Sequence, residues 1–501
     1  MYRPDKILIA ALLFSCTIST SFAQKSTAPP TFAATAKSVT DYYGKYIDEN
    51  RDRHLKEFIE LVSIPSISSI PAHHSDVIRA ADWIVAKLKA IGMPTAEALP
   101  TSGNPVVFAS WLNAPGKPTV LIYGHYDVQP VNEKEWTTPP FSPLARDGKV
   151  YGRGASDDKS GVMTSIWAVE AMLKKDGKLP VNLKFMFEGN EEVGSPGFKT
   201  FLENNKKELK ADFALNADDG QYNDNTPAIT VSLRGSVAME FSVKTADIDG
   251  HSGEFGGKTP NAAVDMAQII TSFFDEKGNV AVKGFYDKVK PITARQKEMI
   301  KKIPYDPMTD RKILGTTAEV GDTSYSPLER VWYRPTLEIV GMQSGYTAEG
   351  HSNIVPGHAT AKITCRLVDN QNGDEIVQLI EKHIEKHCPP GAKITYKVSP
   401  GFASPMSLPA DSKEYLYVAD VLTAIYGKEP YQYASGGSVG AMREVKDILG
   451  LNAYPLGFEL SDENWHASNE FFRESSMRKG QLIYCLYLQH LADEEQHTKN
   501  K

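Results

Sequence analysis

Residues 119–127 (TVLIYGHYD) decide the fold, because they form a short apolar run that ends directly in a histidine and an aspartate. Two similar runs follow, VNLKFMF at 181–187 before EGNEE and DFALN at 212–216 before ADD. Short apolar runs bounded by turn residues are typical of buried strands. Apolar residues at helical spacing occur before the first run, at 76–91, and between the first two runs, at 159–174. Alternating strands and helices predict an α/β domain with a largely parallel sheet.

Polar side chains stand at the end of each predicted strand. His125 follows the first run, Glu191 and Glu192 follow the second, and Asp218 follows the third. In an open α/β sheet, ligands bind outside the carboxyl ends of the strands. We therefore expect these four side chains to converge on one crevice.

Two further segments extend this group. GRGASDDK at 152–159 precedes a helix and places Asp157 and Asp158 near its start, while WHASNE adds a second imidazole, His466. Asp at a helix start is commonly only a cap, and an isolated histidine–aspartate pair is commonly structural. Clustered carboxylates repel one another, however, so this edge needs cations in either case. Imidazole and carboxylate ligands without thiolates favour zinc or manganese.

Composition sets the broad class. The 501 residues are 41% hydrophobic and 23% charged, with a net charge of −7. These values are typical of a soluble protein of more than one domain and exclude a collagen or a multi-span membrane protein. The acidic balance disfavours nucleic acid as a partner. The four cysteines form no CxxC pair, so neither a thiolate metal site nor a disulfide framework is expected.

The first 23 residues have the features of an export signal. Arg3 and Lys6 precede an apolar run at 7–15 that is too short to span a bilayer, and small residues allow cleavage after Ala23. An alternative is that Cys16 is lipidated. We expect an exported protein, periplasmic or secreted, with a flexible leader at 24–44.

The middle of the chain has a different pattern, strand–helix–strand–strand–helix–strand. This order is the ferredoxin-like motif, here interrupted by a long charged stretch at 275–334. The expected elements lie at 236–245, 260–274, 336–342, 359–367, 374–387 and 393–398, with Thr259 as the cap of the first helix. The α/β pattern then returns with helices near 412–426 and 477–491. The predicted domains are a catalytic domain at 45–233 and 403–495 and an inserted α+β domain at 234–402.

Four motifs together resemble the signature blocks of the M20 metallopeptidases. They are GHYDVQP at 124–130, GRGASDDKSG at 152–161, EGNEEVGS at 188–195 and HASNE at 466–470. Within that family the chain looks most like the carnosinase-like dipeptidase branch, and the resemblance extends from about residue 46 to 492. Four blocks in the right order make a specific match.

The resemblance implies a site with two divalent ions, zinc or alternatively manganese, per subunit. Glu191 corresponds to the general base and Asp127 to the acid that orients His125. A cis peptide is implied between residues 157 and 158. The implied metal ligands are His125, Asp157, Glu192, Asp218 and His466, with Asp157 shared by both ions.

The resemblance also implies that the inserted domain is a lid that forms a homodimer. His251, in DGHSG, would reach the partner's active site, and Asn353 would lie near the substrate. Arg366 would grip a substrate carboxylate, which Gly437 and Ser438 would also contact. The chain departs from the family pattern at Ala434 and Gly440, where arginine and proline are common. These departures put the substrate's carboxyl end in doubt.

The sequence therefore predicts an exported di-metal peptidase that hydrolyses dipeptides or short peptides through a metal-activated water, with Glu191 as base. An N-acyl-amino-acid amidohydrolase or a carboxypeptidase of the same family is the nearest alternative. A non-catalytic metal- or peptide-binding protein is the alternative from another class. Glu191 disfavours it, because a binder needs no free carboxylate at that position.

Overall fold

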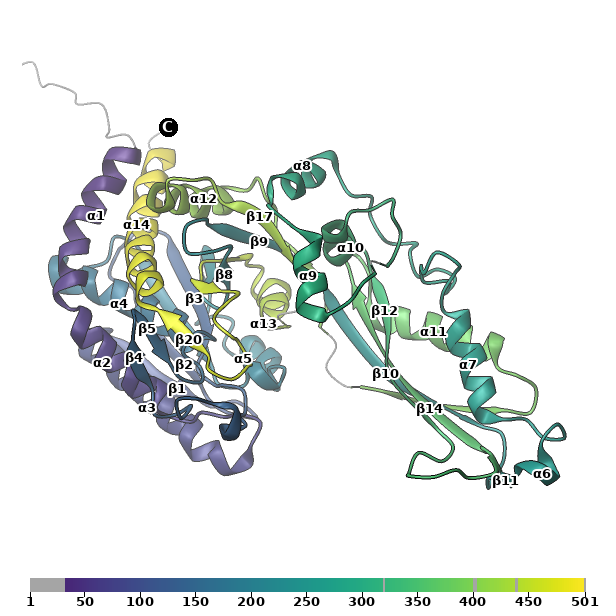
Figure 1. Cartoon of the computed structure of the whole chain (residues 1–501). Coiled ribbons are helices and arrows are strands. Elements are labelled where there is room, and N and C mark those ends of the chain that lie inside the picture. The colour runs from purple at the N-terminus through teal and green to yellow at the C-terminus, as the bar shows by residue number, and fades with distance from the viewer. Residues whose placement is uncertain (1–31, 319, 400–402, 438–439, 500–501) are drawn as a thin grey trace, which may run out of the picture.

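The computed structural model describes residues 32–318, 320–399, 403–437 and 440–499. They form two lobes (Figure 1). The first lobe combines the N-terminal and C-terminal parts of the chain around one large apolar core, and the second has a separate core of its own. Within the described ranges, no helix combines the length and the apolar character needed to cross a bilayer.

A six-stranded sheet forms the centre of the first lobe. Its parallel part combines the three strands predicted at 119–123, 181–187 and 212–216 with a strand at 453–455 that was not predicted, and two antiparallel pairings extend the other side. The antiparallel edge arises because a short connection joins its first two strands, and only antiparallel neighbours can be joined so directly. In spatial order the strands are β1 (Thr95–Leu99), β2 (Val106–Trp111), β6 (Asn182–Glu188), β3 (Thr119–His125), β7 (Phe213–Asn216) and β18 (Ala453–Pro455).

Helices cover this sheet (Figure 1). They are α1 (Phe32–Glu49), α2 (Arg51–Val62), α3 (His74–Ile91), α4 (Lys159–Asp176), α5 (Phe198–Asn204), α12 (Lys413–Tyr426), α13 (Gly440–Glu444) and α14 (Glu474–Lys499). Helix α4 is buried along almost its whole length. A buried helix keeps its first turn fixed, and this first turn follows Asp158 directly.

The flexible leader predicted for residues 24–44 is wrong from Phe32 onward. Residues 32–49 form α1, and its buried residues Ala36, Val39, Tyr43 and Ile47 recur every three to four positions. That spacing makes one apolar stripe along a helix. The Ser-, Thr- and Ala-rich composition concealed the stripe. The predicted signal segment and residues 24–31 lie outside the described residues.

The second lobe contains the predicted strand–helix–strand–strand–helix–strand order. Its antiparallel sheet has the order β12 (Thr336–Ser344), β14 (His358–Leu367), β10 (Gly235–Lys244) and β15 (Lys393–Val398), with helices α7 (Ala262–Ser272) and α11 (Gly373–His387). The expected cap Thr259 is wrong. The Asn261 side chain accepts hydrogen bonds from the backbone N–H groups of Ala263 and Val264 instead.

The charged stretch between residues 275 and 334 contains three helices that the sequence did not predict. They are α8 (Ala294–Lys302), α9 (Pro307–Leu314) and α10 (Pro327–Tyr333). Ile300, Ile303 and Trp332 form a small apolar cluster with Ala434. Helices α8 and α10 thus pack together through this cluster, which joins them to β17 (Tyr431–Ser435) in the C-terminal part of the chain.

Short strands complete the structure. Strands β9 (Ala228–Leu233), β16 (Met406–Ser407) and β17 (Tyr431–Ser435) make one small sheet, and β4 (Leu144–Arg146), β5 (Lys149–Tyr151) and β20 (Phe471–Arg473) another. Two-stranded pairs join β8 (Gly220–Gln221) to β19 (Glu459–Leu460) and β11 (Gly250–His251) to β13 (Ile354–Val355). Helix α6 (Ser252–Phe255) follows β11.

Candidate metal centre

The five predicted metal ligands come together at one edge of the first lobe's sheet. His125 is the last residue of β3, and Asp218 follows β7. Glu192 follows β6, while Asp157 lies just before α4. His466 comes from the loop between β19 and β20. The carboxyl ends of the parallel strands thus position this group as the sequence predicted.

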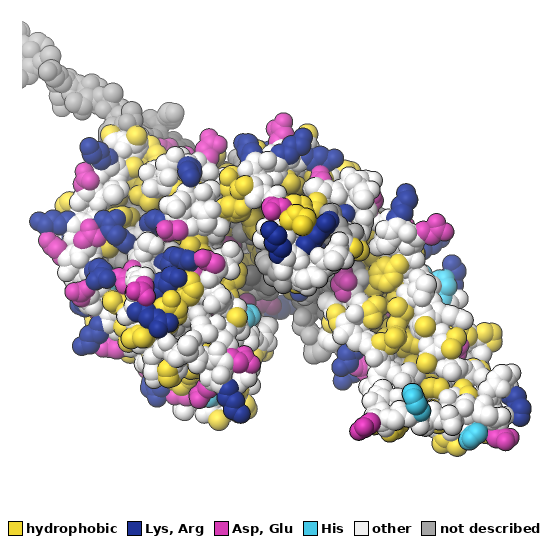
Figure 2. All heavy atoms as spheres, viewed as in Figure 1, with side chains coloured by type: hydrophobic (Ala, Val, Ile, Leu, Met, Phe, Trp, Pro, Cys, Tyr) yellow, Lys and Arg dark blue, Asp and Glu magenta, His cyan; other side chains and the backbone are white. Residues whose placement is uncertain are grey.

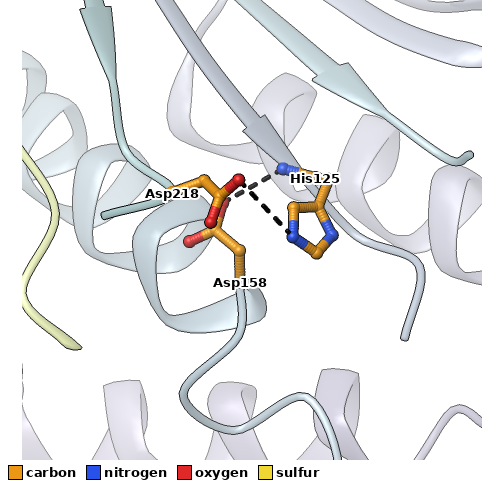
Figure 3. Close-up of side chains that lie close together, drawn as sticks. All are labelled: His125, Asp158 and Asp218. Carbon is orange, nitrogen blue, oxygen red and sulfur yellow. Dashed lines mark hydrogen bonds and ion pairs between the residues drawn. The ribbon is translucent and has the colours of Figure 1, made fainter. Parts of the chain in front are cut away.

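His125 lies at the centre of one half of the group. Its ring Nε2 is 2.9 Å from Asp157 Oδ1 and 3.8 Å from Asp218 Oδ2. The His125 side chain is almost completely buried. Figure 3 shows Asp218 facing the His125 ring, with Asp158 beside them.

His466 forms the other half. Its Nε2 is 2.9 Å from Asp157 Oδ2 and 3.2 Å from Glu192 Oε2. Asp157 therefore turns one carboxylate oxygen to each histidine, which is the arrangement a carboxylate shared by two ions requires. The Asp157–Asp158 peptide is cis, as the family resemblance implied.

Asp127 joins two of the ligand loops. Its backbone oxygen is 3.1 Å and its carboxylate Oδ1 is 3.5 Å from His125 Nδ1. The same carboxylate accepts hydrogen bonds from the backbone N–H groups of Glu191 (3.2 Å) and Glu192 (3.1 Å). A partner on the second ring nitrogen fixes the orientation and tautomer of a ligating histidine. Asp127 thus fixes His125 and the Glu191–Glu192 loop together.

Asp158 is a support for the site. Its Oδ2 accepts a hydrogen bond from the His125 backbone N–H (3.0 Å), and its Oδ1 accepts one from Gly161 (3.2 Å). A Cβ on Gly161 would lie 2.2 Å from Asp158 Oδ1 and 2.6 Å from the Ala217 carbonyl oxygen. Only glycine allows this close approach of α4 to the end of β7.

Two buried acids that received no role from the sequence hold the Asp157 loop. Glu470 Oε1 accepts hydrogen bonds from the backbone N–H groups of Ser156 (2.8 Å) and Asp157 (3.1 Å), and Oε2 pairs with Arg153 at 2.6 Å. Glu463 Oε2 accepts a hydrogen bond from the Ser156 hydroxyl (2.7 Å). Glu470 belongs to the same HASNE block as His466. That shared motif is the sequence signal from which a role at the site could have been predicted for Glu470.

The site's electrostatics reflect its crowded carboxylates. Hydrogen bonds to Asp157 and Glu192 raise the pKa of His466 to about 10. Burial opposes ionisation of Asp157, but hydrogen bonds from His125 and His466 bring its pKa below the ordinary value. Burial raises the pKa of Glu191 to about 8, and the charges of Asp218 and Glu192 act in the same direction. The acids thus need positive charge, which either protonated imidazoles or divalent cations can supply.

The donor set fits divalent metal ions. Three groups of candidate ligands each place one ligand atom per residue within 4.8 Å of the others. Imidazole nitrogen and carboxylate oxygen are ligands that both zinc and manganese accept. The groups are His125, Asp158 and Asp218; Asp157, Glu192 and His466; and Asp157, Asp218 and Glu459. Glu459 is not among the ligands expected from the sequence.

The predicted residues of the second lobe lie elsewhere. His251 in β11 pairs with Ile354 in β13, and the Ser252 backbone N–H donates to the Asn353 carbonyl oxygen at 2.8 Å. His251 and Asn353 are both exposed. Strand β11, which contains His251, lies at the end of the lobe farthest from the first lobe (Figure 1). Within one chain, the structure therefore does not bring His251 and Asn353 to the metal ligands.

Arg366 lines a cavity of about 930 Å³ between the second lobe's sheet and the helices of the charged stretch. No predicted metal ligand is among the described residues that line it. Arg234 lines it too, and its Nε donates to the Gly436 carbonyl oxygen at 3.3 Å. Burial and the charge of Arg366 lower the pKa of Arg234 to about 10. Arg234 thus links the cavity to the turn that contains Gly437, whereas Ser438 lies outside the described residues.

The departure at Ala434 has a structural reason. Ala434 is completely buried in the cluster with Ile300, Ile303 and Trp332. An arginine there would be buried among apolar side chains, which is costly for an unpaired charge. Gly440 begins α13 and has open space where a Cβ would stand.

An α/β sheet whose strand ends gather imidazole and carboxylate ligands, joined to a second α+β lobe, defines a class of metal-dependent hydrolases. The family model described as "Peptidase family M20/M25/M40" matches residues 121–490, and the chain belongs to this family. It is a metallopeptidase of the M20 type, with a mixed α/β fold that matches solved M20 structures.

Three comparisons indicate the range of its relatives. A beta-Ala-His dipeptidase of Rattus norvegicus is 28% identical over 468 residues, covering 89% of this chain and 94% of the relative. A cysteinylglycine-S-conjugate dipeptidase of Corynebacterium striatum is 32% identical over 396 residues, covering 78% and 84%. A solved M20 family metallo-carboxypeptidase from Sulfolobus solfataricus aligns with a TM-score of 0.77 at 30% identity, covering 88% and 99%.

Proposed function

We propose that this chain is a di-metal dipeptidase that hydrolyses dipeptides or other short peptides. The observation that carries the proposal is the position of Asp157 between two histidines. Its Oδ1 is 2.9 Å from His125 Nε2, and its Oδ2 is 2.9 Å from His466 Nε2. The dipeptidase names of two relatives that cover most of the chain support the substrate class.

Each metal ion would have its own histidine. His125 and Asp218 would hold one, His466 and Glu192 the other, and Asp157 would bridge them. Zinc is the proposed metal, with manganese as the alternative. Bound at such a site, the ions polarise the scissile carbonyl and lower the pKa of water.

Glu191 would act as the general base. It is half-buried beside the ligand loop, and burial raises its pKa to about 8 in the absence of metal ions. A carboxyl group whose pKa is raised by burial is suited to accept a proton and then release it. In this proposal its carboxylate takes a proton from the attacking water and gives it to the leaving nitrogen. Asp127 would keep His125 and the Glu191 backbone in position for this transfer.

The second lobe would act as a lid and as the interface of a homodimer. Its edge strand β12 exposes Val340 and Met342, and α7 exposes Val264. Apolar side chains are visible over much of this lobe's surface (Figure 2). An unpaired strand edge with exposed apolar residues favours pairing with another chain.

A dimer would let His251 and Asn353 serve the partner's active site, where His251 would stabilise the oxyanion. Arg366 would bind the substrate carboxylate together with Gly437 and Ser438. Arg234 is close enough to this turn to contribute charge in place of the arginine absent at Ala434.

The proposal is tested by stripping the protein of metal, reloading it with zinc or manganese, and assaying a dipeptide library beside N-acyl amino acids and longer peptides. Dipeptide hydrolysis that depends on metal supports it. Exclusive hydrolysis of N-acyl amino acids, or of C-terminal residues from longer peptides, would support the amidohydrolase or the carboxypeptidase instead, and the solved carboxypeptidase makes the second comparison pertinent. Metal binding without any hydrolysis would support a binding protein.

We also propose export through the segment at residues 1–23. Its basic start and short apolar run support a cleaved signal, with lipidation of Cys16 as the alternative. Mass spectrometry of the protein recovered from cell fractions tests this. An N-terminus at Gln24 outside the cytoplasm is expected, and an intact N-terminus in the cytoplasm would contradict it.

A further inference from the structure

Glu459 is a buried acid beside the candidate metal centre for which the hydrolytic proposal provides no role. Only 5% of its surface is exposed. Its Oε1 is buried and has no hydrogen-bond partner among the described residues. A buried polar atom without a partner is costly, so an uncompensated carboxylate oxygen at this position requires an explanation.

The backbone fixes Glu459 beside Asp218. Strand β19 pairs in parallel with β8, so that Glu459 is opposite Gly220, two residues after Asp218. A Cβ on Gly220 would lie 2.6 Å from the Glu459 carbonyl oxygen. Glycine at position 220 thus allows the Glu459 backbone to lie directly against the segment that follows Asp218.

The Glu459 carboxylate lies close to two of the predicted metal ligands. One ligand oxygen from each of Asp157, Asp218 and Glu459 lies within 4.8 Å of the others. Three carboxylates at this separation repel one another unless a cation lies between them. His125 contacts the first two at 2.9 and 3.8 Å.

Two neighbouring buried acids, Glu463 and Glu470, differ from Glu459 because their carboxylates have hydrogen-bond partners. Glu463 accepts hydrogen bonds from Ser156, from the Leu460 backbone N–H and from Arg473. Glu470 pairs with Arg153 and accepts hydrogen bonds from the backbone N–H groups of Gly154, Ser156 and Asp157. Both acids are therefore accounted for by the protein itself, whereas Glu459 Oε1 is not.

We propose that Glu459 is an additional carboxylate ligand of the ion that His125, Asp157 and Asp218 would hold; the inference rests on the proposed di-metal site. The site would then offer three carboxylates and one imidazole, whereas the site of His466 would offer two carboxylates and one imidazole. Oxygen-rich sites of higher coordination suit manganese, and zinc prefers four ligands with more nitrogen or sulfur. The two sites would therefore differ, with the His125 site favouring manganese.

The decisive variant is Glu459→Gln, which keeps the size of the side chain and one oxygen that can accept a hydrogen bond but removes the charged ligand. Metal-free full-length protein is titrated with MnCl2 and with ZnCl2 by calorimetry, and bound metal is counted by elemental analysis. We expect the manganese affinity of one site to fall at least about tenfold while the other site changes little. Removing a residue that only orients a ligand can lower metal affinity by a similar factor. The ratio of manganese affinity to zinc affinity is therefore the diagnostic quantity, and we expect it to fall.

Glu444→Gln is the matched control. Glu444 also has a buried carboxylate oxygen without a partner among the described residues, but it belongs to no candidate metal group. It should leave both affinities unchanged. Equal metal affinities in Glu459→Gln and the unaltered protein would overturn the proposal and make Glu459 a structural acid only.

Two further outcomes keep the inference separate from the hydrolytic proposal. If Glu459→Gln does not fold, Glu459→Asp replaces it; the shorter carboxylate should lower the manganese-over-zinc ratio, and an unchanged ratio would overturn the proposal. If the unaltered protein binds two manganese ions and hydrolyses no peptide, the proposed function fails while the Glu459 assignment stands. A protein that binds no metal would end both.

Discussion

The metal-ligand edge of the first lobe and the far end of the second lobe contain the two sets of predicted functional residues, and they differ in completeness. At the first, residues as far apart in sequence as Asp157 and Glu470, 313 positions, contact one another. Most of the predicted residues there are buried or half-buried. At the second, His251 and Asn353 are exposed, and their backbone pairing joins β11 to β13. One chain thus brings its candidate metal ligands together by itself but leaves its second set of residues far from them.

Glu191→Gln tests the chemistry of the complete region and should have the largest effect. The amide keeps the size of the side chain but cannot accept a proton, so turnover should fall about 10²–10⁴-fold, as for loss of a general base. Metal content should stay at the level of the unaltered protein. Initial rates on a dipeptide substrate and elemental analysis measure both, and full activity would remove Glu191 from the mechanism.

His251→Ala tests the incomplete region. If His251 stabilises an oxyanion across a dimer interface, turnover should fall about 10²–10³-fold with metals still bound. Mixing Glu191→Gln chains with His251→Ala chains should restore part of the activity, because one site of each mixed dimer has both residues. His358→Ala, on β14 of the same lobe, is the control. No restoration despite demonstrated subunit exchange, or a monomer at assay concentration, would show that the two regions do not cooperate.

Glu470→Gln tests whether the complete region depends on its buried supports. The carboxylate holds the Ser156 and Asp157 backbone N–H groups and pairs with Arg153. Weakening this support should lower metal affinity about 10–100-fold, as for other residues that orient ligands. Calorimetric titration checks the change, and circular dichroism checks the fold. Metal affinity that stays unchanged would mean that the loop is held well enough by its other contacts.

The smallest of these effects is expected in the pH dependence of metal affinity. In the metal-free protein the pKa of His466 is raised to about 10, so the ring holds a proton at neutral pH that a metal must displace. Metal affinity should therefore rise with pH up to about 10, by about tenfold per pH unit for each proton released. Titrations at several pH values in buffers of different ionisation enthalpy measure the released protons. Binding with no proton release would contradict the assignment of His466 as a ligand.

Much of the fold was predictable because local patterns specify it. The apolar runs that became β3, β6 and β7 and the helical spacing of α3 and α4 were evident in the sequence. The errors have physical causes too. The stripe of α1 is hidden by small polar residues, and α8 and α10 pack through a cluster with Ala434, which is more than 100 positions away along the chain.

Which side chains stand at the strand ends can be read from local sequence, because the residues that follow parallel buried strands lie at the same edge of the sheet. His125, Glu192 and Asp218 were identifiable for that reason. Long-range contacts, in contrast, place Glu459 near Asp157 and Asp218 and leave β11, with His251, at the far end of the second lobe. These relations depend on the pairing of β19 with β8 and on the separation of two lobes. Contacts between segments distant in sequence leave no periodic signal in either segment alone.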